Sequence, residues 1–512
     1  MQVWLRVLAA AASGAVLVFV GPPVNLHWVQ WVLYVPLLWA MREHGTGLNV
    51  RLALFSGYAA QVTSFSWLVE TVVRFSNLHV ALGYLALHLF GLAFSVPFLG
   101  FAFAHPLRRR LGLAWVFVLP ALLVALEFLW PQLFPWYHGV VHYRTSWLWQ
   151  LVSVTGVWGV SYLVLLSNCV LAEALWRARE GRPPPWGALA AFVVLYVAAV
   201  GYGAWRVPRV EAQLARARVL QVSMLQQHWT MEERLETPAR VELERWFETT
   251  ARIAGQGAEF VVWPEGACAY NPNEEHTERA LAAMVRAESF DLLLGGGTSE
   301  RTVDPETGKR RHIHYNSAWF MDRSGEIHGR YDKMVPLPFG EYIPFSKTFP
   351  ILKEWIQGPG DFRAGTVPTI FQGDGFTFAT PICYEAIRHG LMRRFRDADL
   401  IVNITNDAWF GDTHCPYQHA MLAAINAVEL GRPVLRIAHS GINMIVEPHG
   451  RILYETAPFT DEAVVRPLRL GTVDTLYRRL GPWFSWLCIA VSLAGIGIAL
   501  WRGPSDRPRR SP

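Results

Sequence analysis

The stretch Thr380-Pro381-Ile382-Cys383-Tyr384-Glu385 decides the fold of the C-terminal half of this chain. The run before it, Phe376–Ala379, predicts a buried strand, and the run after it, Ile387–Asp397, has apolar residues at helical spacing and predicts a helix. A cysteine on the turn between them would lie near a helix N-terminus, where partial positive charge favours a thiolate. The backbone amide of Tyr384 could hold an oxyanion. The stretch therefore predicts a nucleophile, and a buried structural cysteine is the alternative.

Two other predicted strands also end on a reactive side chain. Trp263-Pro264-Glu265 ends the predicted strand 259–263 with a carboxylate, and Tyr331-Asp332-Lys333 ends a predicted hairpin with an amine. A thiol needs a base to become a nucleophile, and acyl transfer needs positive charge where the oxyanion develops. A lone Glu or Lys after a strand is usually a solvated surface residue. The three together predict a catalytic set of Glu265, Lys333 and Cys383.

The rest of the segment from about 210 to 475 alternates between strand and helix patterns. This alternation, with hairpins, predicts an α/β sandwich in which helices cover sheets. The predicted strands are 219–225, 259–263, 291–297, 316–321, 326–331, 376–379, 400–403, 433–439 and 442–447, and the predicted helices are 231–254, 275–289, 387–397 and 416–430. The triple glycine 295–297 is expected to allow close backbone packing near the site.

Residues 334–362 follow neither the strand pattern nor the helix pattern. They combine several prolines with large apolar residues such as Phe345, Phe349, Trp355 and Ile356. A loop of this length inside a compact domain is usually functional or disordered. We expect it either to dip into lipid or to pack on the core of its own domain.

The first 205 residues are a series of long apolar runs. The chain is 52% hydrophobic, only 17% charged and contains 23 tryptophans, which is too apolar for a soluble enzyme of 512 residues. Most runs approach the ~20 residues that cross a bilayer. We predict eight transmembrane helices, over 3–20, 25–41, 52–72, 79–104, 112–131, 147–174, 186–205 and 482–501, with an uncleaved first helix rather than a signal peptide.

Arginines predict the orientation of these spans. Arginines concentrate in alternate connections and in the C-terminal tail, so the positive-inside rule puts both termini in the cytoplasm. The segment 210–475 is then extracytoplasmic, on the periplasmic side of a bacterial inner membrane. The predicted domains are a membrane domain of seven helices (1–209), a catalytic domain (210–475) and a last helix with its tail (476–512).

Few polar residues lie in the spans. Glu70 and Glu127 are the notable ones, and each either has a function or lies near a span end and faces water.

Composition and cysteine spacing exclude several classes of protein. The five cysteines form no CxxC pair, so zinc sites and disulfide frameworks are not expected, although Cys268 and Cys415 could pair in an oxidising compartment. The net charge of +5 is modest and no basic, aromatic-interleaved patch points to nucleic acid. No ligand cluster indicates a metal or an organic cofactor.

Five phrases from about 220 to 455 carry a family resemblance. They are Val262-Trp263-Pro264-Glu265, Tyr331-Asp332-Lys333, Pro338-Phe339-Gly340-Glu341-Tyr342-Ile343-Pro344, Cys383-Tyr384-Glu385 and Asn406-Asp407-Ala408-Trp409-Phe410-Gly411. This segment resembles the nitrilase, or carbon–nitrogen hydrolase, superfamily, whose αββα sandwich uses a Glu-Lys-Cys triad. With seven spans before it and one after, the chain resembles the membrane-embedded branch of that superfamily, which acylates lipoproteins.

The resemblance implies roles for individual residues. Glu265 would be the general base, Lys333 the oxyanion stabiliser and Cys383 the nucleophile. Glu341 matches a supporting carboxylate, and Glu385 matches the acidic residue just after Tyr384. Trp229 matches a tryptophan on the route of substrate access, although Val222–Gln227 departs from the glycine-bearing phrase of the family.

The implied reaction is a two-step transfer in which the enzyme alternates between two forms. Cys383 would take the sn-1 acyl chain of a phospholipid, typically phosphatidylethanolamine, as a thioester. The α-amine of the diacylglyceryl-cysteine of an apolipoprotein would then accept it. We expect a monomer that needs no cofactor. Two alternatives remain: a membrane-tethered nitrilase or amidase acting on a small amide, and a transporter or scaffold whose outer domain is inactive.

Overall fold

The chain, represented by a computed structural model, is described here over residues 3–41, 46–76, 79–303, 310–346, 348–349, 351 and 362–502. It divides into two compact units. The first unit draws on residues 1–68, 84–207 and 475–512 and is helical, whereas the second draws on 69–83 and 208–474 and contains the β-strands. Each unit has its own core.

Helices alone build the first unit. Its longer helices are α1 (Val3–Ala15), α4 (Thr46–Ser64), α6 (Val80–Phe94), α8 (Trp115–Leu129), α10 (Val157–Arg179), α11 (Trp186–Leu214) and α19 (Trp483–Arg502). Its shorter ones are α2 (Leu17–Val20), η1 (His27–Trp31), α3 (Val35–Ala40), η2 (Val96–Phe103), α7 (Ala104–Leu111), η3 (Gly112–Ala114), η4 (Val140–His142), η5 (Leu148–Leu151), α9 (Val152–Thr155) and α18 (Leu476–Leu480).

Five helical runs among the described residues are long and apolar enough to cross a membrane. A bent pair, Gly47–Ser64 with Leu68–Arg74, raises the number to six. One of the five, Val80–Leu129, has 50 residues and contains two of the predicted spans. A straight helix of that length would measure ~75 Å, more than twice the ~30 Å hydrocarbon core. Within it, α8 packs against η2 and α7, so the run turns back near Gly112, whose φ is +59°.

The predicted span 25–41 is shorter in the structure than expected. It is divided between the 3₁₀ helix η1 and α3, which begins at Val35-Pro36. Neither piece alone has the length of a membrane-crossing helix.

Glu127 of α8 is buried rather than facing water. Its Oε2 atom accepts a hydrogen bond from the His138 backbone amide (2.9 Å) and lies 2.6 Å from His138 Nδ1, and its Oε1 atom accepts from Ser161 (2.9 Å). The water-facing interpretation of Glu127 is therefore wrong, because local donors solvate the carboxylate. Glu70, in α5 (Leu68–Ser76) of the second unit, is half-exposed and pairs with Arg74 at 2.8 Å.

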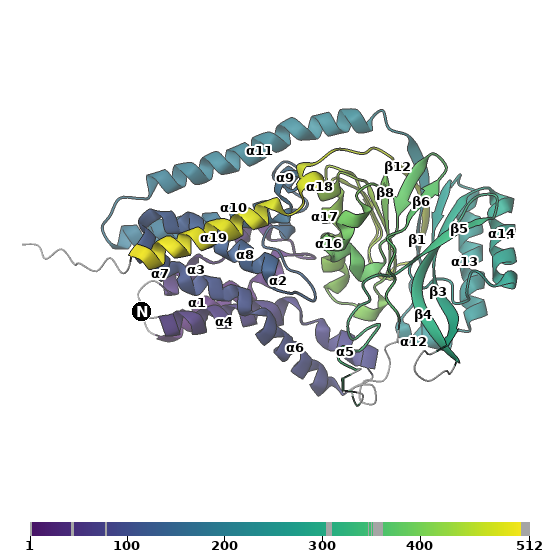
Figure 1. Ribbon diagram of the computed structural model, residues 1–512, viewed down its shortest axis with the longest axis horizontal. Helices are drawn as coiled ribbons and strands as arrows, with labels where there is room; N and C mark the ends of the chain where they lie inside the picture. Colours follow the sequence, from purple (N-terminus) through teal and green to yellow (C-terminus); the bar gives the residue numbers. More distant parts are fainter. Residues whose placement is uncertain are drawn as a thin grey trace, which may run out of the picture. The chain divides into compact units, whose positions relative to one another are not determined.

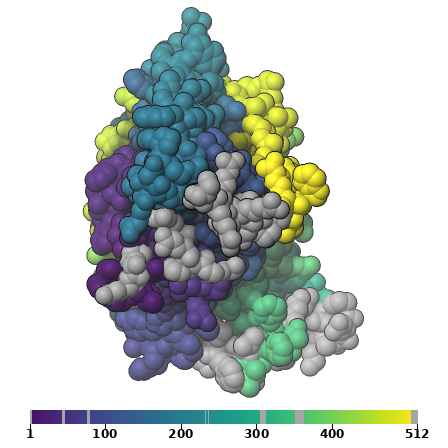
Figure 2. Space-filling model, turned by 90° about the vertical axis from the view of Figure 1, so that its left-hand side faces the viewer, coloured from purple at the N-terminus to yellow at the C-terminus, as the bar shows by residue number. Residues whose placement is uncertain are grey.

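Apolar side chains lie on the outside of the helical unit. Figure 2 shows α11 in blue-teal and α19 in yellow at the surface. Their exposed residues include Val194, Val197, Leu493 and Leu500. Helices that are apolar on their outer faces are typical of membrane proteins.

Two mixed six-stranded sheets form the second unit. The first has the order β12-β1-β2-β3-β4-β5 and the second has the order β11-β10-β9-β8-β7-β6. The strands are β1 (Val219–Gln226), β2 (Phe260–Val262), β3 (Asp291–Val303), β4 (Arg310–Met321), β5 (Ile327–Asp332), β6 (Ile370–Gly373), β7 (Phe376–Ala379), β8 (Leu400–Asn406), β9 (Val434–His439), β10 (Met444–Val446), β11 (Ile452–Glu455) and β12 (Glu462–Arg469). In each sheet three consecutive strands are parallel: β1-β2-β3 and β7-β8-β9.

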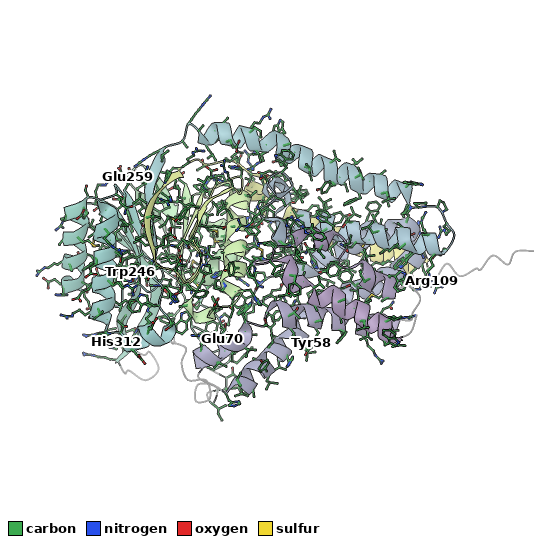
Figure 3. The ribbon with its side chains drawn as sticks, turned by 180° about the vertical axis from the view of Figure 1, so that it is seen from behind. Tyr58, Glu70, Arg109, Trp246, Glu259 and His312 are labelled. Carbon is green, nitrogen blue, oxygen red and sulfur yellow. The ribbon has the colours of Figure 1, made fainter. Side chains whose placement is uncertain are left out.

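Helices cover the outer faces of the two sheets. Figure 1 shows α13 (Ala239–Ala254) and α14 (Glu275–Glu288) beside the first sheet, and α16 (His389–Met392) and α17 (Cys415–Leu430) beside the second. The first interface is a continuous apolar core that contains Trp246 of α13, Leu281 of α14 and Leu292 of β3. Figure 3 shows Trp246 among the packed side chains of this unit. The layered α/β sandwich predicted from the sequence is confirmed.

Two predicted helices differ in the structure. The helix expected over 231–254 is broken at Thr237-Pro238 into α12 (Met231–Glu236) and α13, because a proline restricts the residue before it to extended conformations. The helix expected after Cys383 is replaced by short turns: η6 (Cys383–Ile387), α16 and η7 (Arg393–Phe395). Strands β6, β11 and β12 were not predicted.

Close packing between α1 and α4 depends on Gly14. A Cβ atom at this position would collide with the carbonyl oxygen of Ser56 and lie only 3.0 Å from the backbone nitrogen of Ala60. Small residues at such crossings let membrane helices approach closely.

We predict that Gly14→Ala lowers the melting temperature of the purified protein, since overpacking costs about 1–3 kcal/mol. Gly187→Ala on α11 is the control, because its Cβ would meet nothing within 4 Å; equal melting temperatures for the two variants would contradict the prediction.

Candidate active site

The three residues predicted to carry the chemistry line one cavity. Glu265 follows β2, Lys333 follows β5 and Cys383 begins η6 after β7. The cavity has a volume of about 300 Å³ and is lined by Arg234, Glu265, Gly266, Gly297, Asn316, Lys333, Leu337, Gly340, Glu341, Phe362, Cys383, Asn406, Trp409 and Phe410. Strand β2 belongs to the first sheet, where it is parallel to β3, and β7 belongs to the second sheet, where it is parallel to β8. Residues that follow strands of both sheets therefore line the cavity.

Lys333 lies between two carboxylates. Its Nζ atom is 3.1 Å from Glu265 Oε1 and 2.8 Å from Glu341 Oε2, and its side chain is only 2% exposed. Burial alone would lower the pKa of Lys333, but Glu265 and Glu341 outweigh it and raise the pKa well above its usual value. Lys333 is therefore an ammonium ion throughout the neutral range.

Asn316 of β4 completes this group, and sequence reasoning assigned it only to a strand. Its side-chain amide donates to Glu265 Oε1 and to Glu341 Oε1, both at 2.7 Å. The second oxygen of Glu265 accepts from the backbone amide of Asn406 (2.8 Å), and the second oxygen of Glu341 accepts from that of Leu337 (2.7 Å). Both carboxylates are thus held by hydrogen bonds on each oxygen. Asn316 lacked a motif of its own and could be found only from the pairing of β4 with β3 and β5.

Cys383 occupies a turn with left-handed backbone geometry. Its φ is +52°, a conformation that costs a non-glycine residue about 1–3 kcal/mol. Burial, and then the negative charge of Glu265, raise the pKa of the thiol, although Lys333 lowers it. The predicted thiolate at a helix N-terminus is therefore wrong: only short turns follow Cys383, and the resting group is a thiol that needs a base.

Glu385 anchors the turn that bears the nucleophile. Its carboxylate accepts from the backbone amides of Ile382 (2.8 Å), Met334 (2.7 Å) and Val335 (3.0 Å), and the Tyr331 hydroxyl lies 2.9 Å from both oxygens. Glu385 is fully buried, and burial raises its pKa to about 7, against the hydrogen bond from Ile382 and the charge of Lys333. The residue joins the segment after Lys333 to the Cys383 turn rather than facing the cavity.

Tyr384 and Trp229, which were also predicted as site residues, are not among the residues that line the cavity. The Tyr384 side chain is buried beneath Arg388, whose guanidinium donates to its hydroxyl at 3.2 Å. Trp229 is buried against Ser440 and the guanidinium of Arg245, which lies 4.5 Å from the ring centroid. Trp229 does not line the cavity of Cys383, so its role in substrate access stays a prediction.

The apolar segment after Met334 is described in part. Phe339, Phe345, Phe349 and Ile351 are exposed, with Phe345 at 74%. Trp355 and Ile356 lie outside the described residues. Leu337 and Ile343 of the same segment are buried, so the described part of it both packs on its own unit and exposes apolar side chains.

The cysteines form no disulfide bond, and the described residues contain no candidate metal site. All five cysteines are free thiols, so Cys268 and Cys415 do not pair. Over the ranges that the structure describes, no group of three or more His, Cys, Asp or Glu residues could hold a metal ion.

Gly295 allows the backbone of Glu265 to approach β3. A Cβ at this glycine would lie 2.7 Å from the Cα atom of Glu265 and 2.8 Å from the backbone nitrogen of Gly266. The close backbone packing predicted for the triple glycine is confirmed at Gly295, whereas a Cβ at Gly297 would meet nothing within 4 Å.

The chain is similar to proteins of two known families. The description of the carbon–nitrogen hydrolase family matches residues 217–478, and that of the apolipoprotein N-acyltransferase N-terminal domain matches residues 13–170. An apolipoprotein N-acyltransferase of Geobacter metallireducens is 30% identical over 97% of this chain and 95% of its own length. One of Brucella melitensis is 32% identical over 97% of this chain and 96% of its own length. A solved amidase of Nesterenkonia sp. AN1 aligns with half of the chain at 18% identity and a TM-score of 0.37.

We predict that Gly295→Ala lowers activity at least tenfold, since the added methyl group must displace the backbone that carries Glu265. The measurement is the initial rate of the purified variant. Gly255→Ala, where a Cβ meets nothing within 4 Å, is the control. Full activity of Gly295→Ala would show that this contact does not position Glu265.

Glu385 makes the stability of the α/β unit depend on pH. A group whose pKa rises on folding from 4.5 to about 7 stabilises the protein fully below pH 4.5, and this contribution is lost as the pH rises to 7. The contribution is about 3 kcal/mol. Because Glu385→Gln imitates the protonated form, its deficit in melting temperature should be larger at pH 5 than at pH 8. A deficit that grows with pH would mean that the ionised form is the stabilising one.

Proposed function

Because the chain belongs to the apolipoprotein N-acyltransferases of the carbon–nitrogen hydrolase superfamily, we propose that Cys383 carries an acyl chain from a phospholipid to the α-amine of an apolipoprotein. The single observation that carries this proposal is the buried contact of Lys333 with both Glu265 and Glu341 in the cavity of Cys383. Lipoprotein maturation is the process in which such an enzyme acts.

The first step needs a base for the thiol. Glu265 lines the same cavity as Cys383, and its Oε1 atom is held by Lys333 and Asn316. Moving the thiol proton to Glu265 transfers one negative charge to sulfur without changing the total charge of the buried site. Lys333 then lies between a neutral acid and a thiolate, which its charge stabilises.

Attack of the thiolate on the sn-1 ester of the phospholipid forms a carbon–sulfur bond and an oxyanion. The Lys333 ammonium and the backbone amide of Tyr384 stabilise that charge. Collapse breaks the ester carbon–oxygen bond, and Glu265 returns its proton to the leaving glyceryl oxygen. The products are a lysophospholipid, such as lysophosphatidylethanolamine, and a thioester on Cys383.

The second step uses the same groups in reverse. The neutral α-amine of diacylglyceryl-cysteine attacks the thioester, and Glu265 accepts the proton that the nitrogen loses. The carbon–sulfur bond breaks, an amide forms and the Cys383 thiol regains its proton. Glu341 supports Lys333, and Glu385 holds the Cys383 turn. No cofactor takes part, and a monomer suffices.

Membrane-bound substrates give the apolar parts of the chain a purpose. We infer eight spans, with both termini in the cytoplasm and a catalytic domain of residues 210–475 on the periplasmic face, between a membrane domain (1–209) and a last helix (476–512). The arginine pattern supports the orientation, and counting the bent pair as one span and the folded-back run as two gives seven of the eight spans. The eighth is the segment 25–41, which is divided between η1 and α3. The exposed Phe339, Phe345 and Phe349 can enter the lipid interface, and Trp229 lines the route of the substrate.

Two alternatives share part of these features. A membrane-tethered amidase would use the same three residues on a small amide, and a transporter would use none of them. The full-length match to acyltransferases favours transfer to a lipoprotein over both.

The intact mass of the purified protein after incubation with phosphatidylethanolamine tests the proposal. We predict a gain of one acyl chain, which neutral hydroxylamine removes because it cleaves thioesters. Cys383→Ala should show no gain, since it lacks the nucleophile. Absence of an adduct on the parent protein, together with release of ammonia from a small amide, would establish the amidase instead.

A further inference from the structure

A second group of buried polar and charged side chains contacts the backbone of the nucleophile. We call Asn403, Asp407, His419 and Arg436 the buried charge cluster. They come from β8, the turn after it, α17 and β9, and none is more than 3% exposed. The reaction described above uses none of them.

Asp407 is the centre of the buried charge cluster. Its Oδ2 atom accepts from Arg436 at 2.6 Å, and its Oδ1 atom lies 2.9 Å from His419 Nδ1. Arg436 also donates to the side-chain oxygen of Asn403 at 2.5 Å. Burial would raise the pKa of Asp407, but Arg436 and His419 outweigh it and lower the pKa. Asp407 is therefore a buried carboxylate that is held by Arg436 on one oxygen and by His419 on the other.

The buried charge cluster ends on the nucleophile's own carbonyl group. His419 Nε2 lies 3.3 Å from the carbonyl oxygen of Cys383, and the Asn403 side-chain nitrogen lies 3.5 Å from the same atom and 2.9 Å from the Pro381 carbonyl oxygen. A carbonyl oxygen only accepts hydrogen bonds. His419 Nε2 must therefore carry a hydrogen to make this contact.

The other ring nitrogen of His419 faces a carboxylate, which also only accepts. Arg436 comes within 3.3 Å of Nδ1, but the same nitrogen of Arg436 makes its closer hydrogen bond to Asp407. A hydrogen on Nε2 satisfies the contact with the Cys383 carbonyl oxygen, and Asp407 and Arg436 hold the ring through Nδ1.

The contact between His419 Nε2 and the Cys383 carbonyl oxygen fixes the orientation of the peptide group between Cys383 and Tyr384. In a trans peptide the carbonyl oxygen and the amide hydrogen point in opposite directions. Holding the Cys383 carbonyl oxygen toward His419 therefore turns the Tyr384 amide away from His419. The φ of +52° at Cys383 is strained, so an external contact is needed to maintain it.

We propose that His419, oriented by Asp407 and Arg436, is a positioning residue that fixes the Cys383–Tyr384 peptide so that the Tyr384 amide meets the developing oxyanion. This inference rests on the proposed function. His419 touches neither substrate nor the reacting atoms, and it acts through the backbone of the nucleophile. The merely structural alternative is that the buried charge cluster only ties β8, β9 and α17 together.

Two variants of His419 separate these roles. In His419→Gln the side-chain amide nitrogen takes the place of Nε2 and still donates to the Cys383 carbonyl oxygen. In His419→Asn the shorter amide takes the place of Nδ1, keeps the contact with Asp407 and leaves that oxygen without this donor. Both changes replace the ring by a side-chain amide, so the two variants differ in which partner is kept.

Two reactions of Cys383 are compared in each variant. Thioester formation with phosphatidylethanolamine, followed by intact mass, develops an oxyanion. Alkylation by iodoacetamide displaces iodide and develops none. We expect His419→Asn to slow thioester formation about 100-fold, the usual cost of a lost oxyanion donor, while alkylation changes less than threefold. His419→Gln should recover at least tenfold of the lost rate.

Other results would overturn the proposal. Equal loss of both reactions would mean that the thiol itself has moved, and unchanged thioester formation in His419→Asn would mean that the contact has no role. If His419→Asn does not fold, His419→Gln decides: a fall of more than tenfold in the rate of thioester formation with unchanged alkylation contradicts the proposal, and a fall of tenfold or less supports it. The parent protein without any adduct would refute the proposed function, whereas the alkylation rates are measured independently of it.

Discussion

Everything in the α/β unit that concerns chemistry depends on one buried ammonium ion. An unpaired lysine with 2% of its side chain exposed would cost several kcal/mol, and Lys333 is stable there only because Glu265 and Glu341 lie within 3.1 Å. This requirement brings together the end of β5, the end of β2 and the turn that contains Glu341. The nucleophile turn then joins through Glu385, which binds the backbone after Lys333 and before Cys383.

The electrostatics of the site follow from that arrangement. Burial, and then the negative charge of Glu265, raise the pKa of the Cys383 thiol and keep it protonated at rest, against the charge of Lys333. A proton transfer to Glu265 removes the opposing charge at the moment when the sulfur becomes negative. The same network therefore holds the sulfur as a thiol at rest and stabilises the anion that forms when the proton is transferred.

The sequence predicted the elements whose chemistry is local. Glu265, Lys333 and Cys383 each follow a strand, so they could be predicted as one catalytic set from residue type, order and spacing. Asn316 could not, because its importance comes from the pairing of β3, β4 and β5, which no local pattern contains. The helix expected after Cys383 failed for another reason: tertiary contacts made by Glu385 and Asn403 hold this segment in short turns despite its helical spacing. Strand β11 was missed because it has only four residues, none of them buried, and β12 because Pro467 interrupts its run of strand-forming residues.

The raised pKa of Lys333 has one more consequence. A thioester reacts with any neutral amine within reach, and the amine nearest to this one belongs to the protein itself. Glu265 and Glu341 keep Lys333 protonated, so its nitrogen has no lone pair with which to attack. The intermediate can therefore wait for an amine delivered from outside without modifying the enzyme. The pair of carboxylates protects the protein from self-acylation, and it gives a transferase its selectivity between two primary amines that differ only in their surroundings.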